Sequence, residues 1–194
     1  MSSGTDSSTH ENKTFEKVVY TGKEVRNKEF EQCTFKDCDL SDSLFIHNRF
    51  TECTFVGCNL SMTKLAGSSL RDVTFKQCKL LGVNFSECED FLFSVRFEEC
   101  ILDYASFSRK KMPKTKFINT SLKQVTFAGA NLSNSIFDQA DLTDAIFNGT
   151  DLKEADFRTA NNYAIDPELN AIKKAKFSLH GVAGLLTKYG IRIE

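Results

Sequence analysis

The chain has 194 residues, of which 41% are hydrophobic and 26% are charged, a composition typical of a folded soluble domain. Its formal net charge of −1 gives no support for binding nucleic acid or an anionic membrane, and no stretch approaches the roughly 18 consecutive apolar residues of a membrane span. There are 18 phenylalanines but no tryptophan, which indicates that one large side chain is used repeatedly in a single structural role.

Residues 1–12 are rich in serine and threonine and contain no apolar run, so we expect a disordered tail. They also lack the apolar core of a signal peptide. The seven cysteines are then most simply explained as reduced thiols, which predicts a cytoplasmic protein.

From residue 13 the sequence repeats every five residues. The central position of the repeat, called i below, is apolar or aromatic from Phe15 to Phe85 and, after a slip of two residues, from Leu92 to Phe157. Counting Phe177, 16 of the 18 phenylalanines occupy it, and all seven cysteines lie two places earlier, at i−2. This pattern is typical of neither a helix nor a long strand. It predicts a chain that turns every five residues, with i and i−2 facing inward.

The pattern resembles that of the pentapeptide-repeat family, whose consensus is approximately A(D/N)LXX. It stands here as ANLSN at 130–134, ADLTD at 140–144 and ADFRT at 155–159. The resemblance covers residues 13–177 and implies an all-β fold, a right-handed quadrilateral β-helix with twenty residues per coil and about eight coils. The sequence supports this period independently, because phenylalanine recurs at every fourth repeat, as Phe15, Phe35, Phe55 and Phe75.

Three departures from the repeat are expected to disturb the coil. A frayed first coil is predicted by the lysines at its inward i−2 positions: Lys13, Lys23 and Lys28. The stretch 87–93 contains the two-residue insertion and predicts a bulge at one corner. A second, basic bulge is predicted at 109–114, because Lys110 falls at an inward position and Pro113 has no N–H to donate.

An acidic stretch occupies residues 138–157. Its members at i−1 are interpreted as structural, since a short acidic side chain there bonds nearby backbone in a turn: Asp141, Asp151 and Asp156. Three others point outward without that role and are the candidates for a partner-binding surface: Asp138, Asp144 and Glu154.

The frame continues weakly through Asn162 to Phe177 and gives one last coil. Residues 178–194 then predict a short α-helix, with Ser178 as N-cap, followed by a short strand. This segment either caps the last coil or joins two copies of the chain. The residues that would make a dimer contact are Val182, Leu185, Leu186, Tyr189, Ile191 and Ile193.

No catalytic site is predicted. His10, His47 and His180 are not spaced as a triad or a metal pair, and no glycine-rich phosphate loop occurs. The five-residue spacing of the cysteines places neighbours on adjacent walls of a filled interior, so neither a metal nor a cofactor is expected. Buried cysteines that serve as small apolar side chains are the better interpretation.

The C-terminal spacing LLxxxGI, found here at residues 185–191, extends the resemblance to Qnr-type quinolone-resistance proteins. That likeness implies a homodimer that binds a type II topoisomerase, DNA gyrase or topoisomerase IV, by mimicking duplex DNA. The alternative is a cytoplasmic scaffold with another protein partner and no mimicry. A continuous acidic stripe would favour mimicry, and mixed surface charge would favour the scaffold. Neither hypothesis predicts direct binding of nucleic acid or of a membrane.

Overall fold

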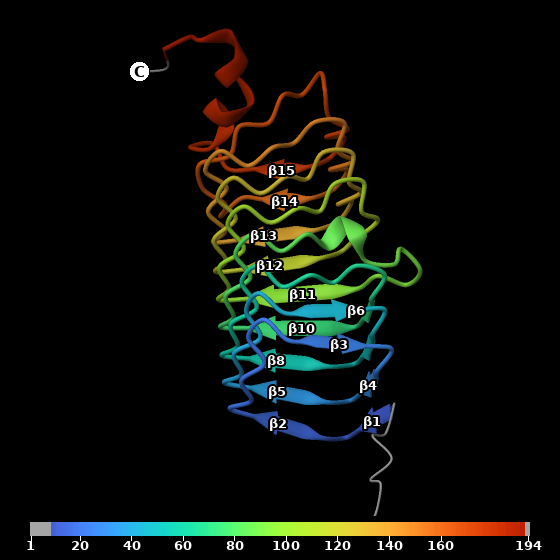
Figure 1. Ribbon diagram of the computed structural model, residues 1–194. Coiled ribbons are helices and arrows are strands. Elements are labelled where there is room, and N and C mark those ends of the chain that lie inside the picture. The colour runs from blue at the N-terminus through green and yellow to red at the C-terminus, as the bar shows by residue number, and fades with distance from the viewer. Residues whose placement is uncertain (1–8, 193–194) are drawn as a thin grey trace, which may run out of the picture.

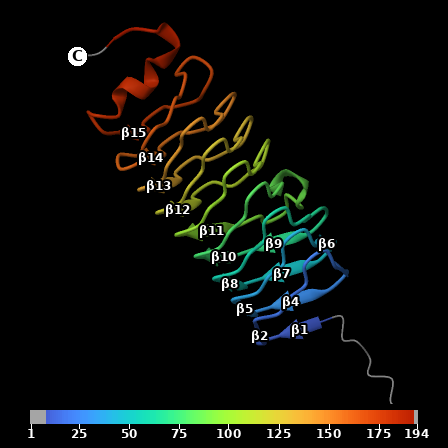
Figure 2. The same ribbon diagram turned by 60° about the vertical axis from the view of Figure 1, so that its left-hand side comes forward.

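The structure, a computed structural model, describes residues 9–192 and shows a rod built from stacked coils of parallel strands (Figure 1, Figure 2). Strands of successive coils pair at a register of four repeats, as Phe15 does with Phe35 and Phe117 with Phe137. The register lengthens by the two-residue insertion where Phe75 pairs with Phe97. The predicted all-β coil of about eight turns is thereby confirmed.

The strands form sheets on three sides of the coil. The longest sheet runs the length of the rod and has nine strands: β2 (Thr14–Glu16), β5 (Thr34–Lys36), β8 (Thr54–Val56), β10 (Val73–Lys76), β11 (Val95–Glu98), β12 (Lys116–Ile118), β13 (Ile136–Asp138), β14 (Asp156–Phe157) and β15 (Lys176–Phe177). A four-stranded sheet contains β1 (Thr9–Glu11), β4 (Glu29–Glu31), β7 (Arg49–Thr51) and β9 (Ser69–Arg71). A two-stranded sheet pairs β3 (Glu24–Arg26) with β6 (Leu44–Ile46). Isolated bridges such as Asp39 to Asn59 hold the fourth side.

The chain turns at each corner because the residue at position i+2 adopts the left-handed backbone conformation. Asn12, Lys17 and Asn27 have φ angles of 51°, 53° and 54°, and the residue at i+2 also has a positive φ angle in most of the later repeats. Asparagine, aspartate and glycine tolerate this conformation better than other side chains, and they are frequent at i+2. The side chains at i and i−2 consequently face the interior, as predicted.

Two stacks of phenylalanine rings fill the core of the C-terminal half. Phe97, Phe117 and Phe137 stack nearly parallel, with ring centroids 5.4 and 5.0 Å apart. Phe107 and Phe127 form a second stack, and Phe107 meets Phe117 edge to face at 6.1 Å. Both geometries are favourable for aromatic rings. The rings are fully buried, so the interior of this half is a packed core rather than a channel.

The first coil begins earlier than the sequence predicts. Thr9–Glu11 pair with Glu29–Glu31, so the assignment of residues 9–12 to a disordered tail is wrong; residues 1–8 of that tail lie outside the described residues. The cause is His10, which takes an i position and stacks on Phe30 with ring centroids 5.1 Å apart. The predicted fraying is also wrong, because β2 and β3 both pair with the second coil.

The two-residue insertion bulges from one corner, as predicted, between Glu89 and Ser94 (Figure 1). The frame expected around it is wrong. Leu92, predicted at i, is 60% exposed and has a φ of 57°, the conformation found at i+2. Phe93 is buried in its place and packs against Phe85, with ring centroids 6.5 Å apart. The insertion thus follows Leu92 instead of preceding it.

The basic bulge predicted at 109–114 is wrong. Lys111 pairs with Asn131, and the N–H of Met112 donates to the Asn131 carbonyl at 2.9 Å, so the coil continues regularly. Pro113 is tolerated because it occupies i+1. In other turns the N–H at i+1 bonds a side chain of its own turn, as Ser133 does with Asn131 Oδ1 at 3.0 Å, and not the next coil.

Residues 178–192 form neither the predicted α-helix nor the described part of the predicted strand. Two short 3-10 helices, η2 (Val182–Leu185) and η3 (Thr187–Tyr189), cover the last coil, a third, η1 (Phe85–Glu87), precedes the insertion, and Ile191 lies outside any strand. Ser178 does accept a hydrogen bond from the Gly181 N–H at 3.0 Å, in the manner of a cap. No helix within residues 9–192 is long and apolar enough to cross a membrane.

The last coil is closed by Tyr163. This residue and Ile165 are buried, whereas Asn162, which the frame placed at i, is exposed. Tyr163 packs directly against two glycines of the C-terminal segment: a Cβ at Gly181 would lie 2.2 Å from its Oη, and one at Gly184 would lie 2.3 Å from its carbonyl oxygen. This close approach favours tight turns over a regular α-helix.

Candidate partner-binding surface

The three acidic candidates do not gather on one face. Asp138 ends β13 in the nine-stranded sheet, and its Oδ1 accepts a hydrogen bond from Thr159 Oγ1 at 2.7 Å. Glu154 is exposed at the corner before β14, so it borders the same sheet from the other side. Asp144 is exposed at an i+2 corner on another side of the coil. One flat partner surface therefore cannot contact all three residues.

The acidic residues interpreted as structural do bind their own turns. Oδ1 of Asp141, Asp151 and Asp156 each accepts the N–H of the residue two places later, at 3.1 Å in all three turns. Burial alone would raise the pKa of Asp141, but hydrogen bonds from Thr143 and Asn162 lower it to about 2. The structural interpretation is confirmed for these three.

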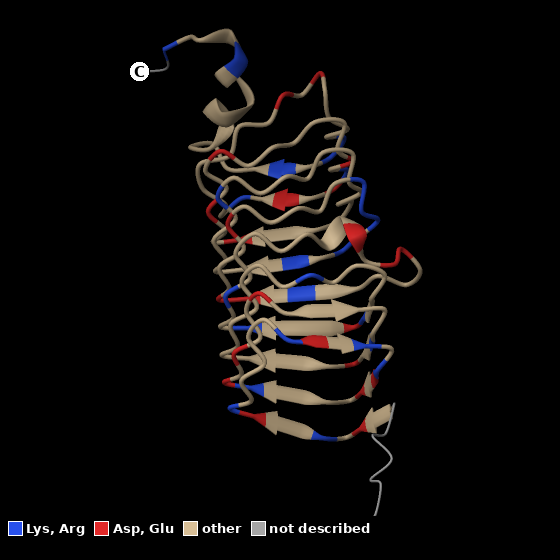
Figure 3. Ribbon diagram, viewed as in Figure 1, with Lys and Arg blue, Asp and Glu red and all other residues tan. Residues whose placement is uncertain are grey.

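Charges of both signs are interspersed along the nine-stranded sheet (Figure 3). Lys36 Nζ lies 3.0 Å from Glu16 Oε1, and Lys76 Nζ lies 3.2 Å from Glu98 Oε2. Further along, the guanidinium of Arg158 lies 2.7 Å from Asp156 Oδ2. Pairs this exposed contribute little to the stability of a fold, because water and salt screen them. Their main consequence is that no continuous acidic stripe runs along this face of residues 9–192.

The insertion creates the most prominent feature on the side of the rod. Phe91 and Leu92 at its tip are 68% and 60% exposed. Arg71 lies over the Phe91 ring at 5.1 Å, and Ser94 Oγ donates to Asp72 Oδ1 at 2.8 Å, so the tip and the C-terminal end of the bulge are both held against the coil before it. The sequence indicates this place, because Phe91 and Phe93 are the two phenylalanines that do not occupy position i. It predicts no contact for either ring.

Lys110 supports the bulge from inside. Its side chain points inward, as predicted, and is 1% exposed. Its Nζ donates to the Cys88 carbonyl, to the Glu89 carbonyl at 3.3 Å and to Asp90 Oδ1 at 2.9 Å. The ammonium also lies 4.7 Å from the centroid of the Phe93 ring. These contacts offset the cost of burying a charged group.

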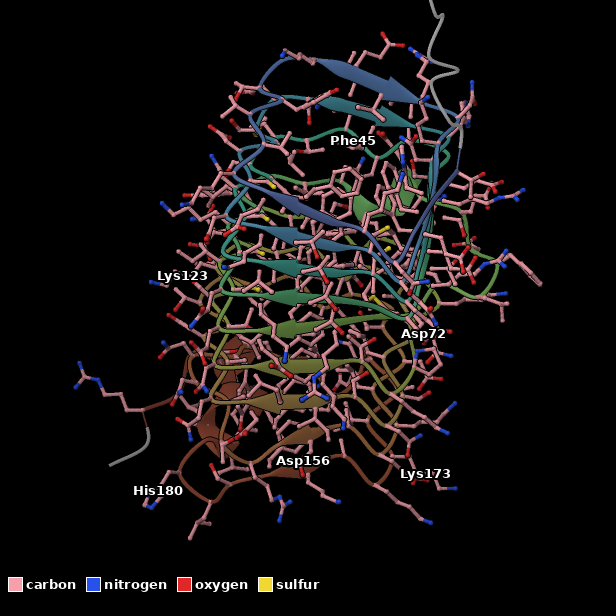
Figure 4. The ribbon with its side chains drawn as sticks, turned by 90° about the horizontal axis from the view of Figure 1, so that it is seen from below. Phe45, Asp72, Lys123, Asp156, Lys173 and His180 are labelled. Atoms are coloured by element: carbon pink, nitrogen blue, oxygen red, sulfur yellow. The ribbon has the colours of Figure 1, made fainter. Side chains whose placement is uncertain are left out.

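The seven cysteines are buried, and Figure 4 shows their sulfur atoms inside the coil. Their thiols are more than small apolar groups: Cys53 Sγ donates to the Phe30 carbonyl and Cys58 Sγ to the Phe35 carbonyl, both at 3.3 Å. The hydroxyl of Ser68 makes the same contact with the Phe45 carbonyl at 2.8 Å. The i−2 side chain thus satisfies a carbonyl of the preceding coil, a role that the five-residue pattern does not indicate.

The histidines are spread over the molecule. His10 lies in β1, His47 at an outward corner with a φ of 55°, and His180 points outward from the C-terminal segment (Figure 4). Within residues 9–192, no group of three or more histidine, cysteine or acidic side chains is arranged to hold a metal ion.

The dimer candidates divide between core and surface. Leu185 packs against the core of the last coil and therefore acts as a cap. Val182, Tyr189 and Ile191 are exposed, Leu186 is half-buried, and Ile193 lies outside the described residues. Tyr189 Oη donates to Glu168 Oε1 at 3.2 Å. The C-terminal segment thus covers the last coil and also presents apolar side chains to solvent.

Comparisons with known proteins agree with the repeat. A profile of the family described as "Pentapeptide repeat region" matches residues 28–107 and 90–157. A search among curated proteins returns no significant match. Among solved structures, full-length QnrB1, a plasmid-mediated fluoroquinolone resistance protein, is 19% identical over 94% of this chain and 100% of its own, with a TM-score of 0.54. HetL, a pentapeptide-repeat protein of the cyanobacterium Nostoc, is 15% identical over 88% and 89% of the two chains, with a TM-score of 0.44. At 19% identity the likeness to QnrB1 concerns the fold alone.

Proposed function

The chain belongs to the pentapeptide-repeat family, and from that premise we propose that it acts without catalysis, by binding another protein along the side of its rod. One observation carries this proposal. The packed phenylalanine interior leaves the outward rows of side chains as the functional surface, and the nine-stranded sheet is the longest continuous row. A flat, regular surface of this kind suits a macromolecular partner better than a small substrate, which needs a concave site.

In its specific form, the proposal is that the partner is a type II topoisomerase, DNA gyrase or topoisomerase IV, and that the rod occupies a surface where duplex DNA would lie. The repeat, the length of the chain and the C-terminal LLxxxGI spacing support this form through their resemblance to Qnr-type proteins. Asp138 and Glu154 border the nine-stranded sheet, and we propose them as contact residues, with Asp144 contacting a partner that wraps round the corner.

The mixed charge of the sheet favours a second candidate, a cytoplasmic scaffold that binds a protein without mimicking DNA. Duplex DNA is uniformly anionic, whereas this face carries charges of both signs, as in the pairs Glu16 with Lys36 and Lys76 with Glu98. The scaffold retains the same binding surface but requires a partner of mixed charge.

We also propose that two copies join end to end through the C-terminal segment. The exposed apolar side chains of Val182 and Ile191 support this proposal, since burying them in an interface would remove them from water. The segment would then cap the coil through Leu185 and dimerise through its outer side.

A supercoiling assay with purified DNA gyrase, with and without a fluoroquinolone, tests the proposed partner. The topoisomerase form predicts inhibition of supercoiling, or protection from the drug, at amounts near stoichiometric with the enzyme. An Asp138→Lys, Glu154→Lys double variant should lose the effect, whereas a Lys123→Glu variant on another side serves as the matched control. No effect across a wide concentration range would remove the topoisomerase form and leave the scaffold.

A further inference from the structure

The two-residue insertion forms a bulge, residues 89–94, that projects from the side of the rod next to η1 (Figure 1). Phe91 and Leu92 at its tip are 68% and 60% exposed, whereas Phe93 fills the core at this place. The coil therefore does not need apolar side chains at the two tip positions. Exposed apolar side chains that adjoin one another and are bordered by charged residues mark a site of interaction.

The tip is held in one position before any partner binds. The guanidinium of Arg71 lies over the Phe91 ring, 5.1 Å from its centroid. On the N-terminal side of the tip, Lys110 Nζ donates to Asp90 Oδ1 at 2.9 Å. Leu92 has a φ of 57°, the left-handed conformation with which the coil turns at its other corners. A surface that is ordered in advance loses less conformational entropy on binding.

A basic hollow lies beside the C-terminal end of the bulge. Its volume is about 240 Å³, and Ser94 of the bulge lines it together with Arg96, Lys114 and Lys116. The one carboxylate in the lining, that of Asp72, accepts a hydrogen bond from Ser94 Oγ at 2.8 Å. Three cationic side chains thus surround a space that is large enough for a carboxylate group of a partner.

Two of these cations have no counter-charge in the chain. Arg96 pairs with Glu98 Oε1 at 2.5 Å. Within residues 9–192, by contrast, neither Lys114 nor Lys116 forms an ion pair, and both are exposed. Elsewhere on the nine-stranded sheet, Lys76 does have a carboxylate partner. The hollow therefore favours a partner that brings carboxylates to Lys114 and Lys116.

The opposite side of the bulge is acidic. Glu87, Glu89 and Asp90 are exposed, and Figure 3 shows acidic residues in η1 and in the bulge. Asp90 also lines a second open hollow, of about 590 Å³, together with Arg109. A uniformly anionic partner, such as a nucleic acid or an anionic membrane, would meet these carboxylates next to the tip, and like charges repel. A protein segment can instead place its carboxylates on the basic side alone.

We propose that the bulge is a docking site for a segment of another protein in which an apolar surface lies next to acidic side chains. The apolar surface covers Phe91 and Leu92 and removes them from water. The acidic side chains enter the basic hollow and accept charge-assisted hydrogen bonds from Lys114 and Lys116. This docking site goes beyond the function proposed above, because a partner that binds an anionic rod in place of DNA carries positive charge, whereas this site selects negative charge.

Selection from a random peptide library displayed on phage tests the proposal, with the full-length wild-type protein as target and a Phe91→Ser, Leu92→Asn variant for depletion. We expect enriched peptides in which aspartate or glutamate adjoins leucine or an aromatic residue. Fluorescence anisotropy of an enriched peptide, made synthetically, should show an affinity at least about tenfold lower for the tip variant. Lys114→Glu with Lys116→Glu should lower the affinity about tenfold, and added salt should weaken binding to the wild type.

Two controls separate the site from general properties of the rod. Lys174→Glu with Lys176→Glu reverses two exposed lysines in the same rows of the coil, since the register of β12 to β15 places Lys176 in the row of Lys116. Tyr104→Ser removes an apolar side chain that is 62% exposed at another corner. Both controls should bind the peptide as the wild type does. None of these variants changes the acidic residues proposed to contact a topoisomerase, so the supercoiling assay tests that function separately.

Three results would overturn the proposal. The first is a library that yields no peptide enriched on the wild type over the tip variant. The second is enrichment of peptides without acidic residues, or wild-type affinity in the Lys114→Glu, Lys116→Glu variant, because either would remove the recognition of negative charge. The third is retention of phosphatidylserine vesicles or of single-stranded DNA by the same residues, because the partner would then be a membrane or a nucleic acid.

Discussion

Lys110 Nζ donates a hydrogen bond to Asp90 Oδ1 at 2.9 Å, and this contact joins the regular coil to the one place where the repeat is interrupted. The two side chains differ in environment, because that of Lys110 is 1% exposed and that of Asp90 is 66% exposed. Lys110 also satisfies the carbonyls of Cys88 and Glu89. The lysine is therefore the structural member of the pair, and the aspartate mainly balances its charge.

Lys110→Ala should lower the free energy of unfolding by roughly 1–3 kcal/mol, because it leaves the carbonyls of Cys88 and Glu89 without their donor. Asp90→Ala should cost less than about 1 kcal/mol, since an exposed carboxylate contributes little to stability. Urea unfolding measures both, with the exposed neighbour Lys111→Ala as the control. Equal losses from Lys110→Ala and Asp90→Ala would contradict this division of roles.

Phe117→Ala should cost roughly 3–5 kcal/mol, the range for emptying a buried phenylalanine site. Its ring is fully buried and stacks on Phe97 and Phe137 at 5.4 and 5.0 Å. Phe91→Ala is the matched control, because its ring is exposed at the tip of the insertion. Urea unfolding would show a loss below about 1 kcal/mol for Phe117→Ala only if the i position did not form the core.

Stability should fall at alkaline pH because of buried thiols. Burial raises the pKa of Cys53 and of Cys88 from 9.0 to about 12. A raised thiol pKa means that the folded state favours the protonated form. The contribution of these thiols to the free energy of unfolding is therefore fully present below about pH 9 and is lost as the pH rises toward about 12. Urea unfolding between about pH 8 and pH 11 should show a shallower decline in a Cys53→Ala, Cys88→Ala variant than in the wild type. The same slope in both proteins would assign the decline to other groups.

Charging the C-terminal segment should separate a dimer. Leu186→Asp and Ile191→Asp would each place a carboxylate in the proposed interface, and burial of an unpaired charge is costly. Sedimentation equilibrium should give a dimer for the wild type and a monomer for both variants. Lys123→Asp, which changes the charge on the side of the rod, should remain dimeric. A wild-type protein that sediments as a monomer would leave the segment as a cap alone.

The repeat made the coil predictable, because each inward residue must pair with the equivalent residue four repeats away in the next coil. Phe117 and Phe137 stack as their separation by four repeats requires. The insertion was located but placed wrongly, because the five-residue pattern favours an apolar Leu92 at position i over the charged Asp90 that a later slip puts there. Packing decides the matter, because it is the ring of Phe93 that reaches the core.

The five-residue pattern does not predict contacts between distant parts of the chain. The inward direction of Lys110 followed from its position, but its acceptors lie in an irregular bulge, so the sequence indicated a disturbance where the structure has a regular turn. The C-terminal apolar spacing is typical of an α-helix, yet Gly181 and Gly184 are required for contact with Tyr163, and η2 and η3 form instead. The acidic candidates were grouped by sequence proximity, whereas the coil distributes neighbouring residues over different faces.

The most direct test of the proposed function is sedimentation velocity of the full-length protein mixed with assembled DNA gyrase, with linear duplex DNA as competitor. We predict a complex at near-stoichiometric amounts, which duplex DNA displaces and which Asp138→Lys with Glu154→Lys weakens. A complex that duplex DNA does not displace would favour protein binding without mimicry. Independent sedimentation of the two proteins across a wide concentration range would contradict the assignment of a type II topoisomerase as the partner.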